Sequence, residues 1–239
     1  MKPNVHFIHL KPHELAERIA DCPLAYLPLG TLEYHSYHLP LGADGMQADA
    51  FFTELAESVG GVVLPMLFLG TAQAKVVDGA ELHGSDIPCG QILPGSLYRI
   101  SDELFAEIIE NIAKLCVRTG FKALCAFGHG PSNAGFYNLK DKMEEKYGIK
   151  FINCWHENPD PELLFMADHA AVSETSVMLH YFEDLVDMTL LPKDLNEWPL
   201  AVSGNDPRLY ASKELGKRTV ECHLEIMKQR LNQLMESIK

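Results

Sequence analysis

Short hydrophobic runs that alternate with helical patterns constrain the fold of this chain more than any other feature. Four runs, typical of buried β-strands, cover residues 24–29, 61–69, 123–127 and 151–154. Stretches with apolar side chains at helical spacing cover residues 44–59, 101–119, 133–147 and 212–238. Strands separated by helices predict an α/β protein, a three-layer α/β/α fold whose mostly parallel sheet is covered on both faces.

The length and composition fit one large globular domain over residues 1–239. A chain of 239 residues with a hydrophobic fraction of 47% can bury a substantial core, which excludes wholesale disorder. The sequence contains no internal repeat and no low-complexity tract. Two long loops, residues 70–96 and 192–207, are rich in turn-forming residues, and loops of this length are usually functional or involved in assembly.

The charge excludes several classes of partner. The chain has 20 Lys+Arg and 33 Asp+Glu, a net charge of −13. Nucleic acids and anionic membranes require a positive surface, so we expect neither as a partner, whereas a small neutral or cationic substrate fits. No run approaches the ~20 apolar residues that span a bilayer. Six scattered cysteines without a C-x-x-C pair are typical of reduced thiols, and we expect a cytoplasmic protein.

The loop after the first predicted strand carries side chains that bind metals. Glu33 and His35 are two residues apart, so in an extended backbone they point the same way. His38 and Asp44 follow within the same loop. Carboxylates and imidazoles together suit Zn²⁺, Mn²⁺ or Fe²⁺, and ligands of open α/β sheets gather beyond the carboxyl ends of strands. The alternative is a polar loop whose histidines cap backbone groups.

A second histidine follows another predicted strand. His129 lies between Gly128 and Gly130, and glycines allow a sharp bend and a close approach of other groups. Because parallel strands end at the same edge of a sheet, we expect His129 to share a crevice with Glu33 and His35. The alternative is a glycine turn with an incidental histidine.

A third segment joins a carboxylate, a histidine and a second carboxylate. Asp168 precedes His169 and can orient its imidazole for proton transfer. Glu174 is a further candidate ligand, or else an ordinary carboxylate in the first turn of a helix. At about 100° per residue, His169 and Glu174 diverge on a regular helix, so both can face one site only if the helix begins at or after His169.

Together these segments resemble the creatininase family of creatinine amidohydrolases. Residues 28–44 match the family motif P-x-G-x-x-E-x-H-G-x-H-L-P-x-x-x-D, with Ser36 in place of a glycine. Residues 127–133 resemble N-G-H-G-G-N, and residues 169–176 resemble H-A-G-x-x-E-T-S with Ala171 at the glycine. Residues 94–96 resemble a P-G-T/S element. The resemblance implies a creatininase-like α/β fold over most of the chain.

The resemblance also implies two divalent metal ions per chain, Zn, Mn or Fe. Glu33, Asp44 and His129 would hold one ion, and His35, Asp44 and a further carboxylate would hold the other, with Asp44 bridging them. In creatininase that carboxylate follows shortly after the histidine matched by His129. No carboxylate follows His129 here, so we assign the role to Glu174.

The chemistry implied is amide hydrolysis by a hydroxide that bridges the two metals. His169 would give a proton to the leaving nitrogen, and Asp168 would set the tautomer and pKa of His169. Ser96, His38 and His83 are the candidate substrate-binding residues, although His83 can equally be a surface histidine.

The tryptophans of this chain depart from the family pattern. Trp155 follows a predicted strand and can line a pocket, or else be a core or interface aromatic. The tryptophan lid of creatininase is not evident, because Trp198 lies far along the chain from Asp168.

We therefore expect a metal-dependent amidohydrolase that acts on an amide, cyclic amide or formamide of a small substrate. One alternative is a hydrolase of another bond in the same superfamily, such as a peptide terminus or a sugar-derived ring ketone. Another is a metal-free binding or assembly protein on the same scaffold. The resemblance implies ring-like homo-oligomers, commonly hexamers, and the apolar side chains of the two long loops favour assembly.

Overall fold

A parallel sheet of four strands forms the centre of the computed structural model, which describes residues 4–154, 160 and 162–238. The strands are β1 (Leu24–Leu29), β2 (Val62–Val63), β5 (Ala123–Gly128) and β6 (Lys150–Asn153). Their order in the sheet is β2-β1-β5-β6, and every pair is parallel. Trp155 lies outside the described residues.

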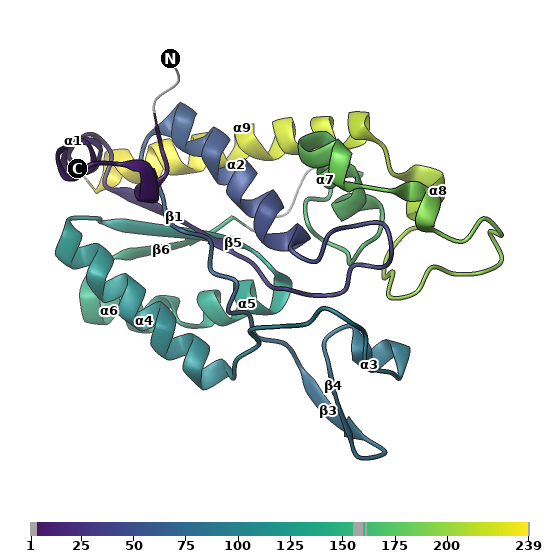
Figure 1. Cartoon of the computed structure of the whole chain (residues 1–239). Helices are drawn as coiled ribbons and strands as arrows, with labels where there is room; N and C mark the ends of the chain where they lie inside the picture. Colours follow the sequence, from purple (N-terminus) through teal and green to yellow (C-terminus); the bar gives the residue numbers. More distant parts are fainter. Residues whose placement is uncertain (1–3, 155–159, 161, 239) are drawn as a thin grey trace.

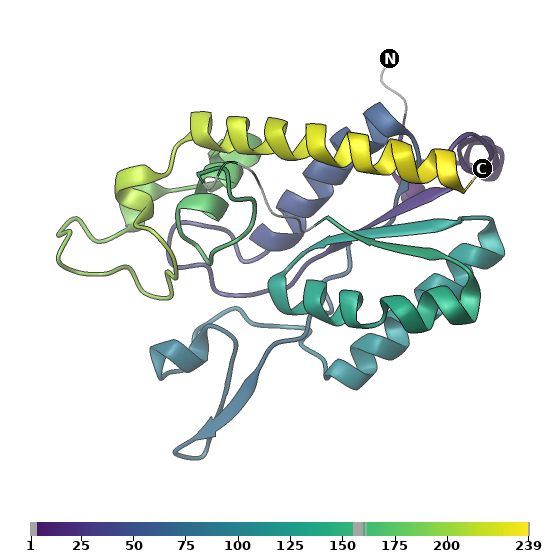
Figure 2. The same ribbon diagram turned by 180° about the vertical axis from the view of Figure 1, so that it is seen from behind.

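Helices cover both faces of this sheet (Figure 1). One face is covered by α2 (Ala43–Val59), α7 (Val172–Phe182) and α9 (Lys213–Ser237), and the other by α4 (Asp102–Thr119), α5 (Gly130–Asn138) and α6 (Lys140–Tyr147). Figure 2, which shows the molecule from behind, shows the long α9 running over the sheet. The predicted three-layer α/β/α fold is confirmed.

Alternate residues of β1 pack into two different cores. Leu24 and Tyr26 join the cluster beneath α2 and α9, whereas Leu27 and Leu29 join the cluster beneath α4 and α5. The period of two follows from strand geometry. Burial on both faces explains why β1 is a continuous hydrophobic run rather than an alternating one.

The remaining elements lie around this framework. They are η1 (Phe7–His9), α1 (Pro12–Asp21), β3 (Ala74–Val77), β4 (Ala80–His83), α3 (Asp86–Cys89), η2 (Glu183–Leu185), η3 (Met188–Leu190) and α8 (Pro207–Tyr210). The antiparallel β3–β4 hairpin projects from the body of the molecule in both views (Figures 1 and 2). Among the described helices, none combines the length and apolarity that a membrane span requires.

Two predicted elements differ from the structure. The strand predicted over residues 61–69 is reduced to Val62–Val63, and its pairing resumes at an isolated bridge between Leu29 and Leu67. The ladder is interrupted by a bulge, because the three-residue step from Leu64, whose N–H donates to Tyr26 O, to Leu67, whose N–H donates to Pro28 O, faces a two-residue step on β1. The single helix predicted over residues 133–147 is two helices, α5 and α6, which meet at a helical Leu139.

The boundary between β1 and β5 determines where a site can form. The helix after β1 lies on one face of the sheet, and the helices after β5 lie on the other. The two connections therefore diverge, and a cavity lined by Glu33 and His129 lies beyond the carboxyl ends of these two strands. Open α/β sheets bind their ligands at such a topological switch point.

Candidate metal centre

A close approach of two backbones places His129 at the edge of the sheet. Gly128 has φ of +142°, and a Cβ on it would lie 1.8 Å from the carbonyl oxygen of Leu29. Only glycine allows this approach, which lets the backbone N–H of His129 donate to Leu29 O at 2.8 Å. The end of β5 is thereby fixed to the end of β1, and the imidazole of His129 is carried into the crevice.

The loop after β1 and the start of α2 supply two carboxylates. The loop folds back on itself, with the backbone N–H of Glu33 donating to Leu41 O at 3.0 Å. Asp44 stands in the first turn of α2 and is 4% exposed. A helix N-terminus stabilises a carboxylate, so Asp44 can remain ionised although it is buried.

The structure brings the five predicted ligands together in two groups that share Asp44. One group is Glu33, Asp44 and His129, and the other is His35, Asp44 and Glu174; in each, one ligand atom per residue lies within 4.8 Å of the others. His35 Nε2 lies 3.2 Å from Asp44 Oδ2 and 3.6 Å from Glu174 Oε2. His129 Nδ1 lies 3.6 Å from Asp44 Oδ2 and 3.8 Å from Glu33 Oε2. We call these the two ligand groups.

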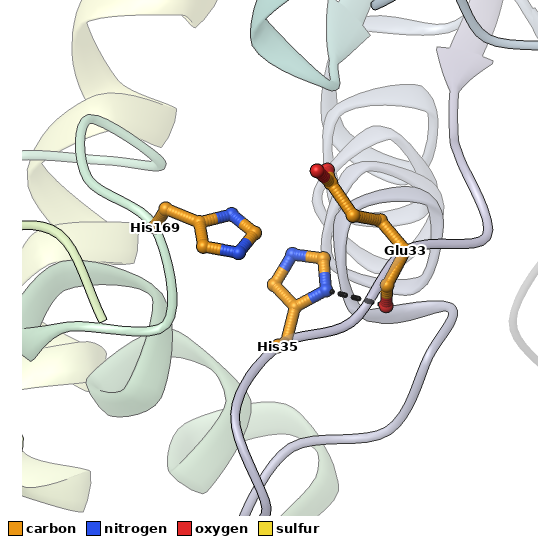
Figure 3. A group of neighbouring side chains, drawn as sticks. All are labelled: Glu33, His35 and His169. Carbon is orange, nitrogen blue, oxygen red and sulfur yellow. Dashed lines mark hydrogen bonds between the residues drawn. The ribbon is translucent and has the colours of Figure 1, made fainter. Parts of the chain in front are cut away.

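Backbone carbonyls orient both histidines of the two ligand groups. His35 Nδ1 donates to the carbonyl oxygen of Glu33 at 3.0 Å (Figure 3), and His129 Nε2 donates to that of Thr71 at 2.9 Å. A carbonyl only accepts, so in the neutral form of each ring, which is the form that binds a metal, the lone pairs would lie on His35 Nε2 and His129 Nδ1, which face the carboxylates. Metal-binding histidines are oriented in this way.

Buried atoms without hydrogen-bonding partners show that a cation fits here. Among the described residues, His35 Nε2 and Asp44 Oδ2 are buried and accept or donate no hydrogen bond. Burial of such atoms is costly unless a partner is present. Two imidazole nitrogens and three carboxylates form a donor set suited to Zn²⁺ or Mn²⁺.

The carboxylates of the two ligand groups differ in their electrostatic environment. Burial opposes ionisation of Asp44, but His35 and His129 hold the pKa of Asp44 well below its usual value. Burial raises the pKa of Glu174 well above its usual value, because the charge of His35 offsets burial only in part. A divalent cation would favour the ionised form of both.

Helix α7 begins at Val172, after His169, as the helix geometry predicts. Asp168 takes the place of an N-cap: its carboxylate accepts from the backbone N–H of Ser173 at 2.7 Å and of Glu174 at 3.0 Å. Glu174 Oε2 in turn accepts from the backbone N–H of Ala170 at 2.7 Å. These bonds direct Glu174, which is 3% exposed, inward toward His35.

The structure gives Asp168 a different task from the one predicted. Its carboxylate is occupied by the backbone of α7, whereas Nε2 of His169 lies 2.9 Å from both Tyr34 O and Ser85 Oγ. The prediction that Asp168 orients the His169 ring is therefore wrong in its contacts. Helix α7 requires acceptors for its first N–H groups, and Asp168 provides them.

His169 itself lies against the two ligand groups. Its ring centroid is 4.4 Å from that of His35 (Figure 3). Burial and the charge of His35 lower the pKa of His169, so the imidazole is neutral near pH 7. The carbonyl of Tyr34 requires the proton on Nε2, which leaves the lone pair on Nδ1.

Ser85 is a site residue that the sequence motifs did not single out. Its hydroxyl donates to Glu33 Oε1 at 2.7 Å, its backbone N–H donates to the same oxygen at 3.0 Å, and Oγ lies 2.9 Å from His169 Nε2. Gly84 has φ of +51°, and a Cβ there would lie 2.6 Å from Glu33 Oε1. Because residue 84 is a glycine, the chain after the hairpin can approach Glu33 Oε1 closely. The other carboxylate oxygen, Glu33 Oε2, faces His129.

A cavity of about 760 Å³ opens onto this centre. Its lining includes Glu33, Asp44, His129, His169 and Glu174, together with parts of both long loops. The loop residues are Ala72, Gln73, Gly84, Ser85, Ile87, Pro88, Cys89 and Trp198–Ser203. Trp198, far from Asp168 in the sequence, therefore lines the same cavity as Asp168, a placement that no local pattern reveals.

The three candidate substrate-binding residues lie outside the lining of this cavity. His38 is buried beneath α7, where its Nε2 lies 2.9 Å from Thr175 Oγ1. His83 and Ser96 line a separate small pocket of about 20 Å³ that also includes Glu33. His83 ends β4, and Ser85, two residues further on, is the residue of this segment that contacts Glu33 and His169.

The chain is similar to known proteins over most of its length. The family described as Creatininase: Creatinine amidohydrolase matches residues 9–223. A creatinine amidohydrolase from Pseudomonas putida is 26% identical over 189 residues, which cover 74% of this chain and 71% of that protein.

Solved structures show the same fold. A crystal structure of creatinine amidohydrolase (creatininase) superimposes with a TM-score of 0.77 at 20% identity, covering 97% of this chain and 98% of that one. A Zn–Zn form of a creatininase variant has a TM-score of 0.77, and a manganese form of creatininase has 0.72; each is 20% identical and covers 98% of this chain and 99% of its own.

The fold and the matches define a hydrolase of α/β architecture, in a class that acts on C–N bonds other than peptide bonds. More narrowly, the chain belongs to the creatininase family. The resemblance drawn from the motifs is thereby confirmed.

Proposed function

We propose that this protein is a metal-dependent amidohydrolase that holds two divalent ions, Zn²⁺, Mn²⁺ or Fe²⁺, and hydrolyses an amide, cyclic amide or formamide of a small substrate. The observation that carries the proposal is the pair of ligand groups that share Asp44. When bound, the ions supply a water of lowered pKa as the nucleophile and polarise the carbonyl.

The ligand residues have distinct tasks in this proposal. Asp44 serves both ions, Glu33 and His129 complete one ligand group, and His35 and Glu174 complete the other. Thr71 O and the backbone carbonyl of Glu33 fix the tautomers of His129 and His35. Such outer contacts orient ligands and tune their basicity.

His169 moves the proton. Its Nδ1 carries the lone pair while Nε2 is held by Tyr34 O, so Nδ1 can accept a proton and release it to the departing nitrogen. The lowered pKa of His169 keeps Nδ1 available near neutral pH. Asp168 supports the reaction through the position of Glu174 rather than through the His169 ring.

Removal and return of metal test this function. Chelator-treated protein, reloaded with zinc or manganese, is assayed against creatinine, hydantoins, formamides and short peptides. We expect hydrolysis of at least one C–N substrate, lost on chelation and restored by metal. Hydrolysis confined to peptide termini or ring ketones would instead support the alternative hydrolase. A metal-free protein that is stable and inactive would support the binding or assembly protein.

We further propose that the protein forms a homo-oligomer in the cytoplasm, with a hexamer as the expected state. The support is exposure of apolar side chains on both long loops: Ile92 is 67% exposed, Leu195 55% and Trp198 52%. Apolar clusters of this kind mark contact surfaces. Light scattering that gives a mass near 26.7 kDa, the mass of one chain, would contradict assembly.

A further inference from the structure

Residues 70–73, which we call the Thr71 segment, orient the histidine of one ligand group. Thr71 is 3% exposed, and its carbonyl oxygen lies 2.9 Å from Nε2 of His129. In the neutral ring this carbonyl requires the proton on Nε2, which leaves the lone pair on Nδ1, the atom that faces the carboxylates of the group. His129 can therefore bind a metal through Nδ1 as long as the carbonyl of Thr71 keeps its place.

Two backbone bonds anchor the ends of the Thr71 segment. The N–H of Ile100 donates to Gly70 O at 3.1 Å, and the N–H of Gly84 donates to Gln73 O at 3.0 Å. Both donors belong to the main chain, so neither bond requires a particular side chain. The two carbonyls in the middle of the segment accept from side chains instead.

Arg99 holds the middle of the Thr71 segment. Its Nη2 donates to the carbonyl oxygen of Ala72, the residue after Thr71. The planar peptide groups that carry these two carbonyls meet at the Cα of Ala72, so a shift of one changes the direction of the other. The guanidinium of Arg99 thereby acts on His129 through two hydrogen bonds and one stretch of backbone.

Arg99 also shares a small pocket with a carboxylate of the same ligand group. The pocket of about 20 Å³ is lined by Arg99, Glu33, Thr71 and Ala72, among others. Glu33 is one of the carboxylates whose negative charge acts on the guanidinium. A space of this size holds about one water molecule, so it is too small for a substrate. Arg99 therefore acts on groups of the protein rather than on a substrate.

We propose that Arg99 is a positioning residue for one of the two metal ions: it fixes the Thr71 segment, whose carbonyl keeps the Nδ1 lone pair of His129 toward that ion. This inference rests on the proposed function, because it takes His129 to be a metal ligand. The other ion depends on His35, whose Nδ1 is held by the backbone carbonyl of Glu33 instead. The two ions therefore differ in their dependence on Arg99.

Calorimetric titration of chelator-treated protein with zinc tests this difference. The main variant is Arg99→Met, because methionine keeps an apolar stem and removes both the donor and the charge. We expect the variant to bind one ion about 10- to 100-fold more weakly, the range typical of groups that orient ligands, and the other ion with unchanged affinity. Thermal unfolding of the same metal-free preparations measures stability separately.

A second variant and a control isolate the positioning role. Arg99→Lys keeps a positive charge and a donor, so we expect a smaller loss than in Arg99→Met, at the same ion. Lys75→Met is the matched control: Lys75 is an exposed cation on β3, and its replacement removes the same charge close to the Thr71 segment. Both zinc affinities should be unchanged in the control.

Combination with His129→Ala identifies the ion that depends on Arg99. In the His129→Ala protein the ligand that Arg99 orients is gone, so Arg99→Met should cause no further loss of zinc affinity. Residues that act through one another are non-additive in this way, whereas independent residues add. Losses that add in the double variant would therefore contradict the connection from Arg99 to His129.

The outcomes distinguish this inference from the proposed function. An equal loss at both ions, or no loss in any Arg99 variant that folds, would overturn the positioning role and leave the metal centre standing. A lower unfolding temperature of Arg99→Met with both affinities unchanged would show a structural role alone, and would overturn it as well. Binding of fewer than two ions by the parent protein would overturn the proposed function, and the present inference with it.

Discussion

The carboxylate of Asp168 accepts a hydrogen bond from the backbone N–H of Glu174 at 3.0 Å, so the residue before His169 holds the start of the helix that carries a ligand. A second bond, from Ser173 N–H at 2.7 Å, completes this cap. The position of Glu174 against His35 thus depends on a side chain that does not contact His35.

Replacement of Asp168 tests this dependence. Asp168→Ala should lower the free energy of unfolding by about 1–2 kcal/mol, the usual cost of a lost helix cap. Because Glu174 would lose its fixed position, the affinity for one of the two metals should fall while the other is retained. Thermal unfolding with metal titration measures both effects, and unchanged binding of both ions would show that the position of Glu174 does not depend on Asp168.

Ser85 should matter although it binds no metal. Ser85→Ala removes the hydroxyl that joins Glu33 Oε1 and His169 Nε2. We expect a loss of about 10- to 100-fold in metal affinity or turnover, the range typical of residues that orient ligands. Ser85→Thr, which restores a hydroxyl, should recover part of it. Full activity of Ser85→Ala would refute the positioning role.

His169 should be needed for turnover and dispensable for metal. His169→Ala should keep both ions and lose about 10²- to 10⁴-fold in turnover, the scale of general acid–base catalysis. Elemental analysis and steady-state kinetics on one preparation measure the two properties. Loss of a metal together with activity would make His169 a ligand, as its grouping with Glu33 and His35 allows.

Ser36 occupies a backbone conformation that favours glycine. Its φ is +58°, and its buried hydroxyl has no hydrogen-bonding partner in the part of the chain that the structure describes. Ser36→Gly should therefore raise the free energy of unfolding by about 1 kcal/mol, because the left-handed conformation costs glycine little. Ser36→Ala removes only the hydroxyl and keeps the strain. Chemical denaturation of the three proteins measures this, and a destabilised glycine variant would show that the strain is absent.

Much of the centre was predictable because parallel strands end at one edge. Leu24–Leu29 and the run that begins at Ala123 are apolar, which predicts two buried strands, and the structure shows that they are neighbours. Glu33 and His129 follow them directly, so their meeting requires only sheet topology. The family motif has a glycine at the position of Ser36. The structure agrees with this, because Ser36 has a positive φ, a conformation that glycine adopts easily.

The contacts that the sequence did not reveal are made between distant loops. Ser85 reaches Glu33 because the projecting hairpin, Ala74–Val77 with Ala80–His83, returns the chain to the body of the molecule just before Ser85. Hydrophobic periodicity is weak in such an exposed hairpin, so the sequence of residues 70–96 predicts a loop rather than two strands. The backbone of Ser203 pairs with that of His169, and Trp198 lies in the cavity lining on the same loop as Ser203. Residues 169 and 203 are far apart in the sequence, so no local sequence pattern predicts this pairing.

The sharing of Asp44 by two metal ions is the central claim, and metal stoichiometry tests it most directly. Purified protein and Asp44→Ala are loaded with zinc, dialysed and measured for metal per chain, with Asp49→Ala, on the same helix but outside the ligand groups, as control. The account predicts about two equivalents in the parent and the control, as in two-metal hydrolases, and loss of both ions in Asp44→Ala. Two ions retained by Asp44→Ala, or none bound by the parent protein, would contradict it.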